Sequence, residues 1–324
     1  MKRPGFYVSV SPYVHSGNSI TKTSFQTIAA LVPALLAGWF FFGWPALKIV
    51  AISIVAALAA EFLWQKALGL PVRIGNGSAL LTGFLLGLIL STEVPWWIPV
   101  IGACVAVIVG KQIFGGLGNN PFSSVIVGWS FVQISYNELM QDFPSPEPLF
   151  LLEPGEYLVD IPMVTIREEF DMIGDVPWLD LFIGNVPGGI GTVSVLAVLL
   201  GGAYLLFKRN ITWHIPLSFI VSAWIFGFIF WRIDPDIYAN PTFHIFSGWM
   251  MLGAFFLATE KGTAPVTVPA MICYGIGCGV LTMIIRIWGG YVEGVPFAIL
   301  LMNGVTPLLD RIRPRAAGRI KEIA

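Results

Sequence analysis

Ten apolar stretches constrain this chain more than any other feature, because each crosses, or nearly crosses, a hydrocarbon layer about 30 Å thick. They lie at 26–43, 46–64, 78–92, 96–110, 121–136, 190–207, 214–232, 245–259, 267–287 and 295–310. Apolar residues make up 56% of the chain and charged residues 11%, whereas a soluble globular chain has roughly 25% charged residues. The expected partner is therefore the lipid bilayer, and we predict an all-α, multi-pass membrane protein. The stretches 78–92 and 121–136 are short and rich in Gly or bounded by Pro, which favours broken or re-entrant segments there.

Composition also excludes other classes of protein. A net charge of −1 leaves no basic surface for nucleic acid, so we expect no nucleic-acid partner. The three cysteines have no metal-ligand spacing, and we predict no metal site. The first 25 residues are polar and contain no apolar run followed by a cleavage site, so we expect the first span to be retained.

The basic residues are unevenly distributed over the connections between spans. If both ends of the chain face the cytoplasm, fourteen of the 18 lysines and arginines are on the inner side, and the outer side holds only Lys48, Arg167, Arg232 and Arg286. Cytoplasmic connections carry such an excess, and an odd number of spans would scramble it. We predict an even number of spans, with both termini in the cytoplasm of a bacterial inner membrane.

One long acidic connection divides the ten spans into two blocks of five. Because five is odd, the second block enters the membrane from the opposite side, as inverted repeats do. We predict a cytoplasmic arm (1–25), a first five-helix repeat (26–136), an outer connection (137–189), a second five-helix repeat (190–310) and a basic cytoplasmic tail (311–324). A glycine-rich element precedes the last span of each block, at 115–120 and 289–294. We expect these breaks to meet near the midplane and form a site.

Seven motifs spread over nearly the whole chain carry a family resemblance. They are SPYVHSGNS (11–19), NGSALLTGFLLG (76–87), VPWWIPVIG (94–102), KQIFGGLGNNPF (111–122), WHIPLSF (213–219), HIFSGWMMLGAFFLAT (244–259) and GVPFAILLMNGVTPLLDRIRPR (294–315). In this order they resemble the family of membrane subunits called RnfD in Rnf complexes and NqrB in sodium-pumping NADH:quinone oxidoreductases.

The resemblance implies a ten-helix subunit with a fold similar to that of urea channels. Such a subunit carries electrons through flavins within a complex that moves Na⁺ or H⁺. The implied partners are the other membrane and peripheral subunits, including a flavoprotein at the outer face. In that family, one FMN is esterified to a threonine in a motif like D-x-x-S-G-A-T of the outer connection. A second flavin, riboflavin or FMN, is held without a covalent bond among the helices.

The family's attachment motif is absent from the corresponding connection of this chain. Its nearest equivalent is Asp160 followed by Thr165, at a spacing of five residues rather than six, with Met163-Val164 in place of Gly-Ala. Small residues let a phosphate approach the backbone closely, and this pair lacks them. Thr165 is therefore either the covalent FMN acceptor or an ordinary loop threonine.

A second candidate for phosphate binding lies in the turn before the sixth span. Gly188, Gly189 and Gly191 precede a helix that we expect to begin near Thr192. Exposed N–H groups at a helix N-terminus favour phosphate. The alternative is a membrane-entry turn whose glycines permit close packing.

The element at 115–120 is the candidate site for the non-covalent flavin. A glycine-rich, non-helical stretch at membrane depth must have its backbone satisfied by protein, ligand or water, and amide side chains suit the edge of an isoalloxazine ring. The residues concerned are Gly115, Gly116, Gly118, Asn119 and Asn120, and the polar residues that would complete the pocket are Asn76, Ser78, Thr82 and Ser247. The alternative is a purely structural re-entrant turn.

Three further charged residues, Glu61, Arg286 and Asp310, lie near predicted span ends, where long side chains reach the interface. We interpret them as interfacial rather than as an ion path. The first functional hypothesis is a flavin-carrying electron-transfer subunit that is not a complete enzyme alone. The alternative is a flavin-free channel or scaffold with the same fold. A secondary transporter is disfavoured because the spans have almost no central charges.

Overall fold

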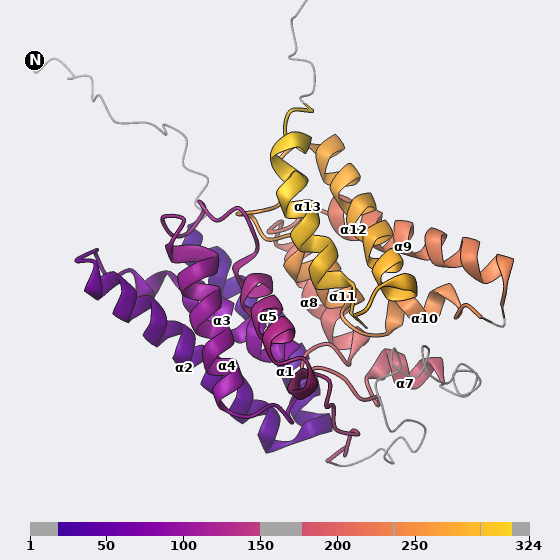
Figure 1. Cartoon of the computed structure of the whole chain (residues 1–324), viewed down its shortest axis with the longest axis horizontal. Coiled ribbons are helices and arrows are strands. Elements are labelled where there is room, and N and C mark those ends of the chain that lie inside the picture. Colours follow the sequence, from indigo (N-terminus) through magenta and orange to yellow (C-terminus); the bar gives the residue numbers. More distant parts are fainter. Residues whose placement is uncertain (1–18, 150–176, 236, 292, 313–324) are drawn as a thin grey trace, which may run out of the picture.

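The computed structural model describes residues 19–149, 177–235, 237–291 and 293–312, and every regular element in these ranges is helical (Figure 1). Four helices are long and apolar enough to span a membrane: α1 (Ile20–Phe42), α2 (Trp44–Ala67), α9 (His214–Ile233) and α12 (Val268–Trp288). Five shorter apolar helices accompany them: α3 (Ser78–Ile89), α4 (Trp97–Val107) with its π-helical continuation η2 (Ile108–Gln112), α5 (Ser124–Ser135), α8 (Val195–Phe207) and α13 (Val295–Leu309). For the described residues, the prediction of an all-α chain with several helices able to span a membrane is confirmed.

Short helices occupy the connections. They are η1 (Ile74–Asn76), η3 (Glu138–Met140) and α7 (Trp178–Ile183). The stretches 78–92 and 121–136, for which we expected breaks, form the short but continuous helices α3 and α5.

Two helices begin at residues other than those predicted, and a capping side chain explains each difference. α1 begins at Ile20 rather than 26, because the Ser19 side chain accepts a hydrogen bond from the Lys22 N–H at 3.1 Å and caps the helix. α8 begins at Val195 rather than 190, because the Ser194 side chain accepts from the Ala197 N–H at 3.3 Å. The expectation that this helix begins near Thr192 is therefore wrong.

The predicted span 245–259 is not one helix. It is divided into α10 (Pro241–Phe246), α11 (Met250–Leu252) and the π-helical turn η5 (Gly253–Leu257). The division falls at Gly248, whose φ of +66° is a left-handed conformation that ends a right-handed helix. A hydropathy window averages over this single residue and therefore reports an unbroken span.

The helices pack in two groups, drawn in purple and in orange to yellow in Figure 1. In the first group α2 lies against α3 and α4, and α4 lies against α5; in the second group α9 lies against α10 and α12, and α12 lies against α13. Between the groups, α1 packs on α8 and α5 packs on α13. The α1–α8 contact is so close that a Cβ on Gly201 would overlap the Ala30 carbonyl oxygen.

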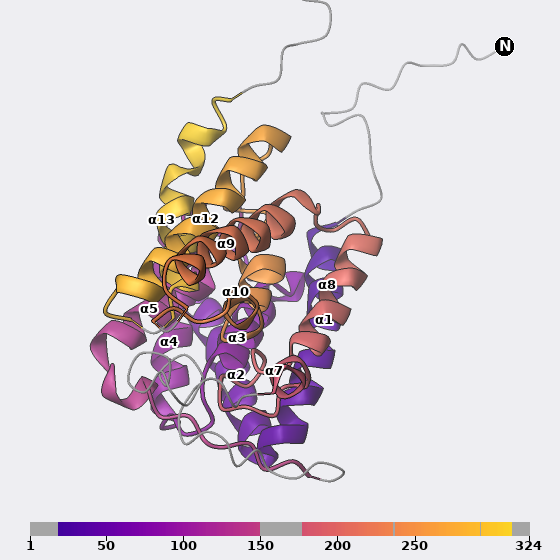
Figure 2. The same ribbon diagram turned by 90° about the vertical axis from the view of Figure 1, so that its right-hand side faces the viewer.

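Aromatic side chains join the two groups of helices. Trp129 of α5 contacts Trp249 and Phe297, with ring centroids 4.6 and 5.6 Å apart. Ser19 and Ile312, the outermost described residues, lie at the same end of the bundle (Figures 1 and 2). We call this the terminal end, and the opposite end, where α7 lies, the distal end.

Candidate functional site

The predicted site residues fall into three sets. Asp160 and Thr165, the candidates for covalent FMN attachment, lie outside the described residues. The remaining candidates divide between the terminal and the distal ends of the bundle, and each set surrounds a buried ion pair.

The ion pair at the terminal end joins Lys111 to Glu61. The Lys111 Nζ donates to Glu61 Oε1 at 2.9 Å, and the two side chains are 3% and 2% exposed. Two amide side chains also donate to Glu61 Oε1, from Gln112 at 2.9 Å and from Gln65 at 3.3 Å. A charged pair this deep needs further hydrogen bonds for stability. Here the three donors converge on Oε1, and Glu61 Oε2 is buried without a hydrogen-bond partner among the described residues.

Three of the predicted flavin-site residues surround this pair. Ser78 Oγ accepts from the Lys111 Nζ, and Asn76 Oδ1 accepts from the Ser78 N–H and hydroxyl at 2.9 and 2.8 Å. The Thr82 hydroxyl donates to the Ser78 carbonyl at 3.0 Å. These polar groups are therefore engaged with partners inside the protein.

Local backbone geometry brings the pair together. The wide π turn η2 ends the fourth helix and carries Lys111 toward α2. Gly110 allows η2 to approach α5, because a Cβ at this position would lie 2.9 Å from the Ser124 Cα. Gly77, with φ +74°, turns the chain from η1 into α3 and so positions Asn76 and Ser78.

The second helix group also reaches this cluster. Asn120 is 5% exposed, its Nδ2 donates to the Phe122 carbonyl at 3.0 Å, and its Oδ1 lies 3.2 Å from where a Cβ on Gly262 would be. The Glu260 carboxyl faces Ser123, Lys111 and Asn120. We call this set the terminal cluster: Glu61, Gln65, Asn76, Ser78, Lys111, Gln112, Asn120 and Glu260. It bridges the two groups of helices.

The glycines at 115–118 are at the edge of this cluster, at the terminal end of the bundle. Gly115, Gly116 and Gly118 have φ values of +99°, +93° and +90° in a solvent-facing turn, and Asn119 is exposed. The element 289–294 follows α12 at the distal end. The expectation that the two glycine-rich elements meet is therefore wrong, because α4 runs toward the terminal end and α12 runs away from it.

The ion pair at the distal end joins Arg286 to Glu293, with Nη2 and Oε2 3.2 Å apart. Arg286 also donates to the carbonyls of His244 at 2.6 Å and Ser247 at 3.2 Å, and Glu293 Oε1 accepts from the Trp249 N–H at 3.2 Å. We call these five residues the distal cluster. The Arg286 guanidinium donates to carbonyls at the end of α10, and the Glu293 carboxylate accepts from an N–H before α11. The pair therefore supplies partners to backbone groups that the break in the helix leaves without intrahelical bonds.

Gly248 makes this arrangement possible. A Cβ there would overlap Glu293 Oε1 and lie 2.9 Å from the Arg286 Nη2. Glu293 lies in the connection between α12 and α13, where burial raises the pKa of its carboxyl, and the charge and hydrogen bond of Arg286 oppose that shift.

Sequence reasoning missed both ion pairs. Glu61 and Arg286 were expected at the interface, but they are 1% and 3% exposed, so that expectation is wrong for these two residues. The available signal was that a charged residue within a span requires a partner of opposite charge. Lys111 is such a partner, at a distance of 50 residues along the chain.

Ser247 does not join Asn76, Ser78 and Thr82. It lines a distal cavity of about 20 Å³ that also includes Gly188, Gly189 and Thr192. An adjoining cavity of about 50 Å³ shares Trp249 and Glu293 with it. The predicted pocket of Asn120 with Ser247 is therefore wrong, because the two residues belong to clusters at opposite ends.

The glycine turn at 188–191 packs closely against α3. The N–H groups of Ile190 and Gly191 donate to the carbonyls of Leu90 and Leu88 at 3.0 and 2.6 Å, and Thr192 Oγ1 donates to the Gly189 carbonyl at 3.2 Å. A Cβ on Gly191 would lie 2.8 Å from the Leu88 Cβ. These N–H groups are engaged by the protein, which favours the close-packing interpretation of this turn over phosphate binding.

The two distal cavities and the Asn76–Ser78 contacts leave no space for a flavin at these predicted positions. Small-molecule sites typically have volumes of about 300–1,000 Å³, whereas the distal cavities measure about 50 and 20 Å³. The polar groups of Asn76 and Ser78 at the terminal end are already engaged.

Comparison with known proteins identifies the family. Residues 7–318 match the model of the NQR2, RnfD, RnfE family. The chain belongs to this family. The resemblance drawn from the seven motifs is confirmed.

Relatives within the NQR2, RnfD, RnfE family match nearly from end to end. The chain is 39% identical over 316 residues to a subunit of the Na(+)-translocating ferredoxin:NAD(+) oxidoreductase complex of Acetobacterium woodii, covering 94% of this chain and 92% of the relative. It is 34% identical over 322 residues to a subunit of the proton-translocating ferredoxin:NAD(+) oxidoreductase complex of Clostridium ljungdahlii, covering 96% and 95%. It is 35% identical over 347 residues to a subunit of the ion-translocating oxidoreductase complex of Cronobacter sakazakii, covering 97% and 99%.

Proposed function

We propose that this chain is a membrane subunit of a redox-driven complex that moves Na⁺ or H⁺ across a bacterial inner membrane. The observation that carries the proposal is the nearly full-length match to one type of subunit in ion-translocating oxidoreductase complexes. The partners are the other membrane and peripheral subunits of such a complex, including a flavoprotein at the outer face. Both termini lie in the cytoplasm, as the distribution of lysine and arginine indicates.

We infer that ten crossings form two inverted five-helix repeats. Support comes from equivalent contacts: α2 with α4 and α4 with α5 in the first repeat correspond to α9 with α12 and α12 with α13 in the second. Equivalent helices of the two repeats pack on each other, α1 on α8 and α5 on α13, as a two-fold axis in the membrane plane requires. The broken segment α10–η5 takes the third place of the second repeat.

The energetics of coupling are adequate for this role. Moving one charge against 100 mV requires about 2.3 kcal/mol. A two-electron step over about 100 mV releases roughly twice that amount, at about 1.4 kcal/mol per 30 mV.

Ion uptake into inverted membrane vesicles tests the proposed function. In vesicles from a strain that lacks this chain, we expect reduced ferredoxin and NAD⁺ to drive no Na⁺ or H⁺ uptake, and we expect the restored chain to recover it. Uptake driven by ATP hydrolysis in the same vesicles is the control and should not change. Ferredoxin-driven uptake that persists without the chain would refute the proposal.

We further propose that Thr165 carries a covalent FMN on the outer connection, with Asp160 as the upstream acidic residue. Support comes from family membership and the position of the pair in that connection. In-gel flavin fluorescence of the denatured chain should disappear in Thr165→Ala and persist in the matched variant Thr192→Ala. Fluorescence that persists in Thr165→Ala would contradict this attachment.

A flavin-free channel or scaffold is the second candidate. It is favoured by the missing S-G-A-T motif and by the small volumes of the distal cavities. A wild-type chain without in-gel fluorescence, whose purified complex is also colourless, would support this candidate against the flavin-carrying one.

A further inference from the structure

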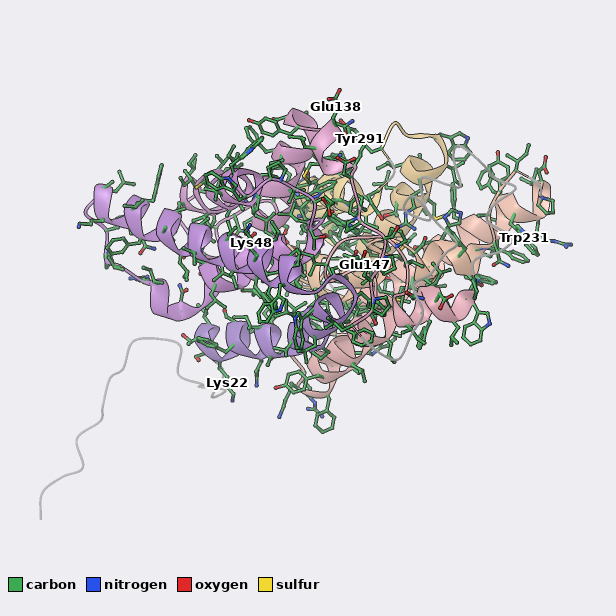
Figure 3. All side chains as sticks on the ribbon, turned by 90° about the horizontal axis from the view of Figure 1, so that it is seen from below. Lys22, Lys48, Glu138, Glu147, Trp231 and Tyr291 are labelled. Carbon is green, nitrogen blue, oxygen red and sulfur yellow. The ribbon has the colours of Figure 1, made fainter. Side chains whose placement is uncertain are left out.

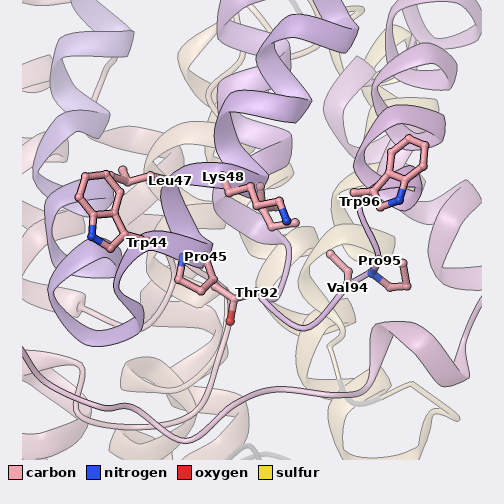
Figure 4. Close-up of a pocket in the computed structure, with 9 residues that line it drawn as sticks. Trp44, Pro45, Leu47, Lys48, Thr92, Val94, Pro95 and Trp96 are labelled. Atoms are coloured by element: carbon pink, nitrogen blue, oxygen red, sulfur yellow. The ribbon is translucent and has the colours of Figure 1, made fainter.

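A groove of about 730 Å³ opens at the distal end, between the start of α2 and the loop that precedes α4 (Figure 4). Its lining residues are mainly apolar: Trp44, Pro45, Leu47, Ile49, Val94, Pro95 and Trp96, with Thr92 and Lys48 as the polar members. The volume lies within the range of small-molecule sites, about 300–1,000 Å³. This groove is separate from both ion-pair clusters.

Two exposed tryptophans flank the groove. Trp44 is 75% exposed and Trp96 is 64% exposed, on opposite sides of Lys48 (Figure 4). Tryptophan is enriched at the level of the lipid headgroups, because its ring is apolar and its N–H is polar. The two rings therefore place the mouth of the groove at the membrane interface.

Lys48 supplies an exposed positive charge within this groove. It makes no ion pair within the described part of the chain. Two acidic residues lie at the same end: Glu93 stands between the lining residues Thr92 and Val94, and Glu147, labelled with Lys48 in Figure 3, donates its N–H to the Phe41 carbonyl at the end of α1. Lys48 is one turn into α2, beside apolar side chains. A cation at the interface attracts anionic headgroups, and the Thr92 hydroxyl offers a further hydrogen-bond donor.

We propose that this groove binds the headgroup of an anionic phospholipid. The phosphate lies against the Lys48 ammonium, and the glycerol and upper acyl chains lie against Trp44, Pro45 and Trp96. An acidic protein segment would also complement Lys48, but it would leave the two exposed rings without an apolar partner. The membrane supplies both the charge and the apolar chains at this level.

Native mass spectrometry of the full chain released from nanodiscs tests this site. The nanodiscs contain phosphatidylcholine with or without phosphatidylglycerol. We expect the wild type to retain phosphatidylglycerol in preference to phosphatidylcholine, and Lys48→Gln to reduce that preference about fivefold, as expected for one lysine near a lipid surface. Lys48→Arg should keep the preference, which separates lost charge from misfolding.

Lys66→Gln is the matched control, because Lys66 lies on the same helix at the terminal end. It should retain the wild-type preference. An unchanged preference in Lys48→Gln, or an equal loss in Lys66→Gln, would overturn the proposal. The proposal would also be overturned if inorganic phosphate, added to phosphatidylcholine nanodiscs, were retained in place of lipid, because the ligand would then be a free anion. The proposal would equally be refuted if, without phosphatidylglycerol, an acidic protein segment occupied the groove and covered Lys48.

Discussion

Lys111→Met is expected to lower the free energy of unfolding by about 3–5 kcal/mol, the usual effect of removing one partner from a buried ion pair. The substitution leaves the Glu61 carboxylate 2% exposed, with only the amides of Gln65 and Gln112 as partners. It also removes a cation that faces Glu260 across the two groups of helices. Unfolding of the full chain in mild detergent, followed by tryptophan fluorescence, measures the loss.

Two further variants isolate the cause. Lys66→Met removes an exposed lysine near the same end of α2 and should change the free energy of unfolding by no more than about 0.5 kcal/mol. The double variant Lys111→Met with Glu61→Leu removes both charges of the pair and should recover part of the lost stability, since Glu61 is no longer a buried carboxylate without its cation. The recovery is partial because Glu260 still lacks the Lys111 ammonium. A Lys111→Met variant as stable as Lys66→Met would show that the terminal pair does not hold the bundle together.

Gly248→Ala is expected to be strongly destabilising for so small a substitution. The new Cβ would overlap Glu293 Oε1, at a residue whose φ of +66° is already unfavourable for alanine. Displacing Glu293 leaves the Trp249 N–H and the buried Arg286 without their partner. We expect destabilisation of about 3 kcal/mol or more, measured by the same unfolding assay and by the yield of assembled complex.

Gly118→Ala provides the matched comparison for backbone strain alone. Gly118 has φ +90°, but no atom lies within 4 Å of the position that a Cβ would take. We expect destabilisation of about 1–2 kcal/mol from the left-handed conformation. Equal effects of the two variants would mean that the Arg286–Glu293 pair does not depend on Gly248.

The positions of most helices could be predicted because lipid imposes simple requirements. A span must be apolar and of sufficient length, and both properties can be computed from a short window of sequence. Capping shifted the boundaries, as at Ser19 and Ser194, where one side chain decides where the helix starts. Such local hydrogen bonds affect one turn, so they move an end without creating or removing a helix.

The break at Gly248 and the two ion pairs could not be predicted in this way. The break depends on one residue within an apolar run, and its stability depends on Arg286 and Glu293, which lie far along the chain. Glu61 and Lys111 are likewise 50 residues apart. Their pairing follows from which helices pack together, which periodicity and hydropathy do not encode.

The candidate site was predicted in part. Asn76, Ser78 and Thr82 do lie together with the buried Lys111, whereas Ser247 lies with the glycines at the distal end. Polarity within a span identified residues that require partners, but it did not identify which partners they have. The family was recognised more securely, because it rests on motifs along the whole sequence rather than on one cluster.

Labelling of single cysteines from each side of the membrane tests the inverted architecture most directly. Leu117 and Gly290 follow the fourth helix of each repeat, α4 and α12, so Leu117→Cys and Gly290→Cys occupy equivalent places. In a cysteine-free chain, we predict that an impermeant maleimide reaches Gly290→Cys from the outside and reaches Leu117→Cys only from the cytoplasmic side. Labelling of both positions from the same side would contradict the inverted arrangement of the two repeats.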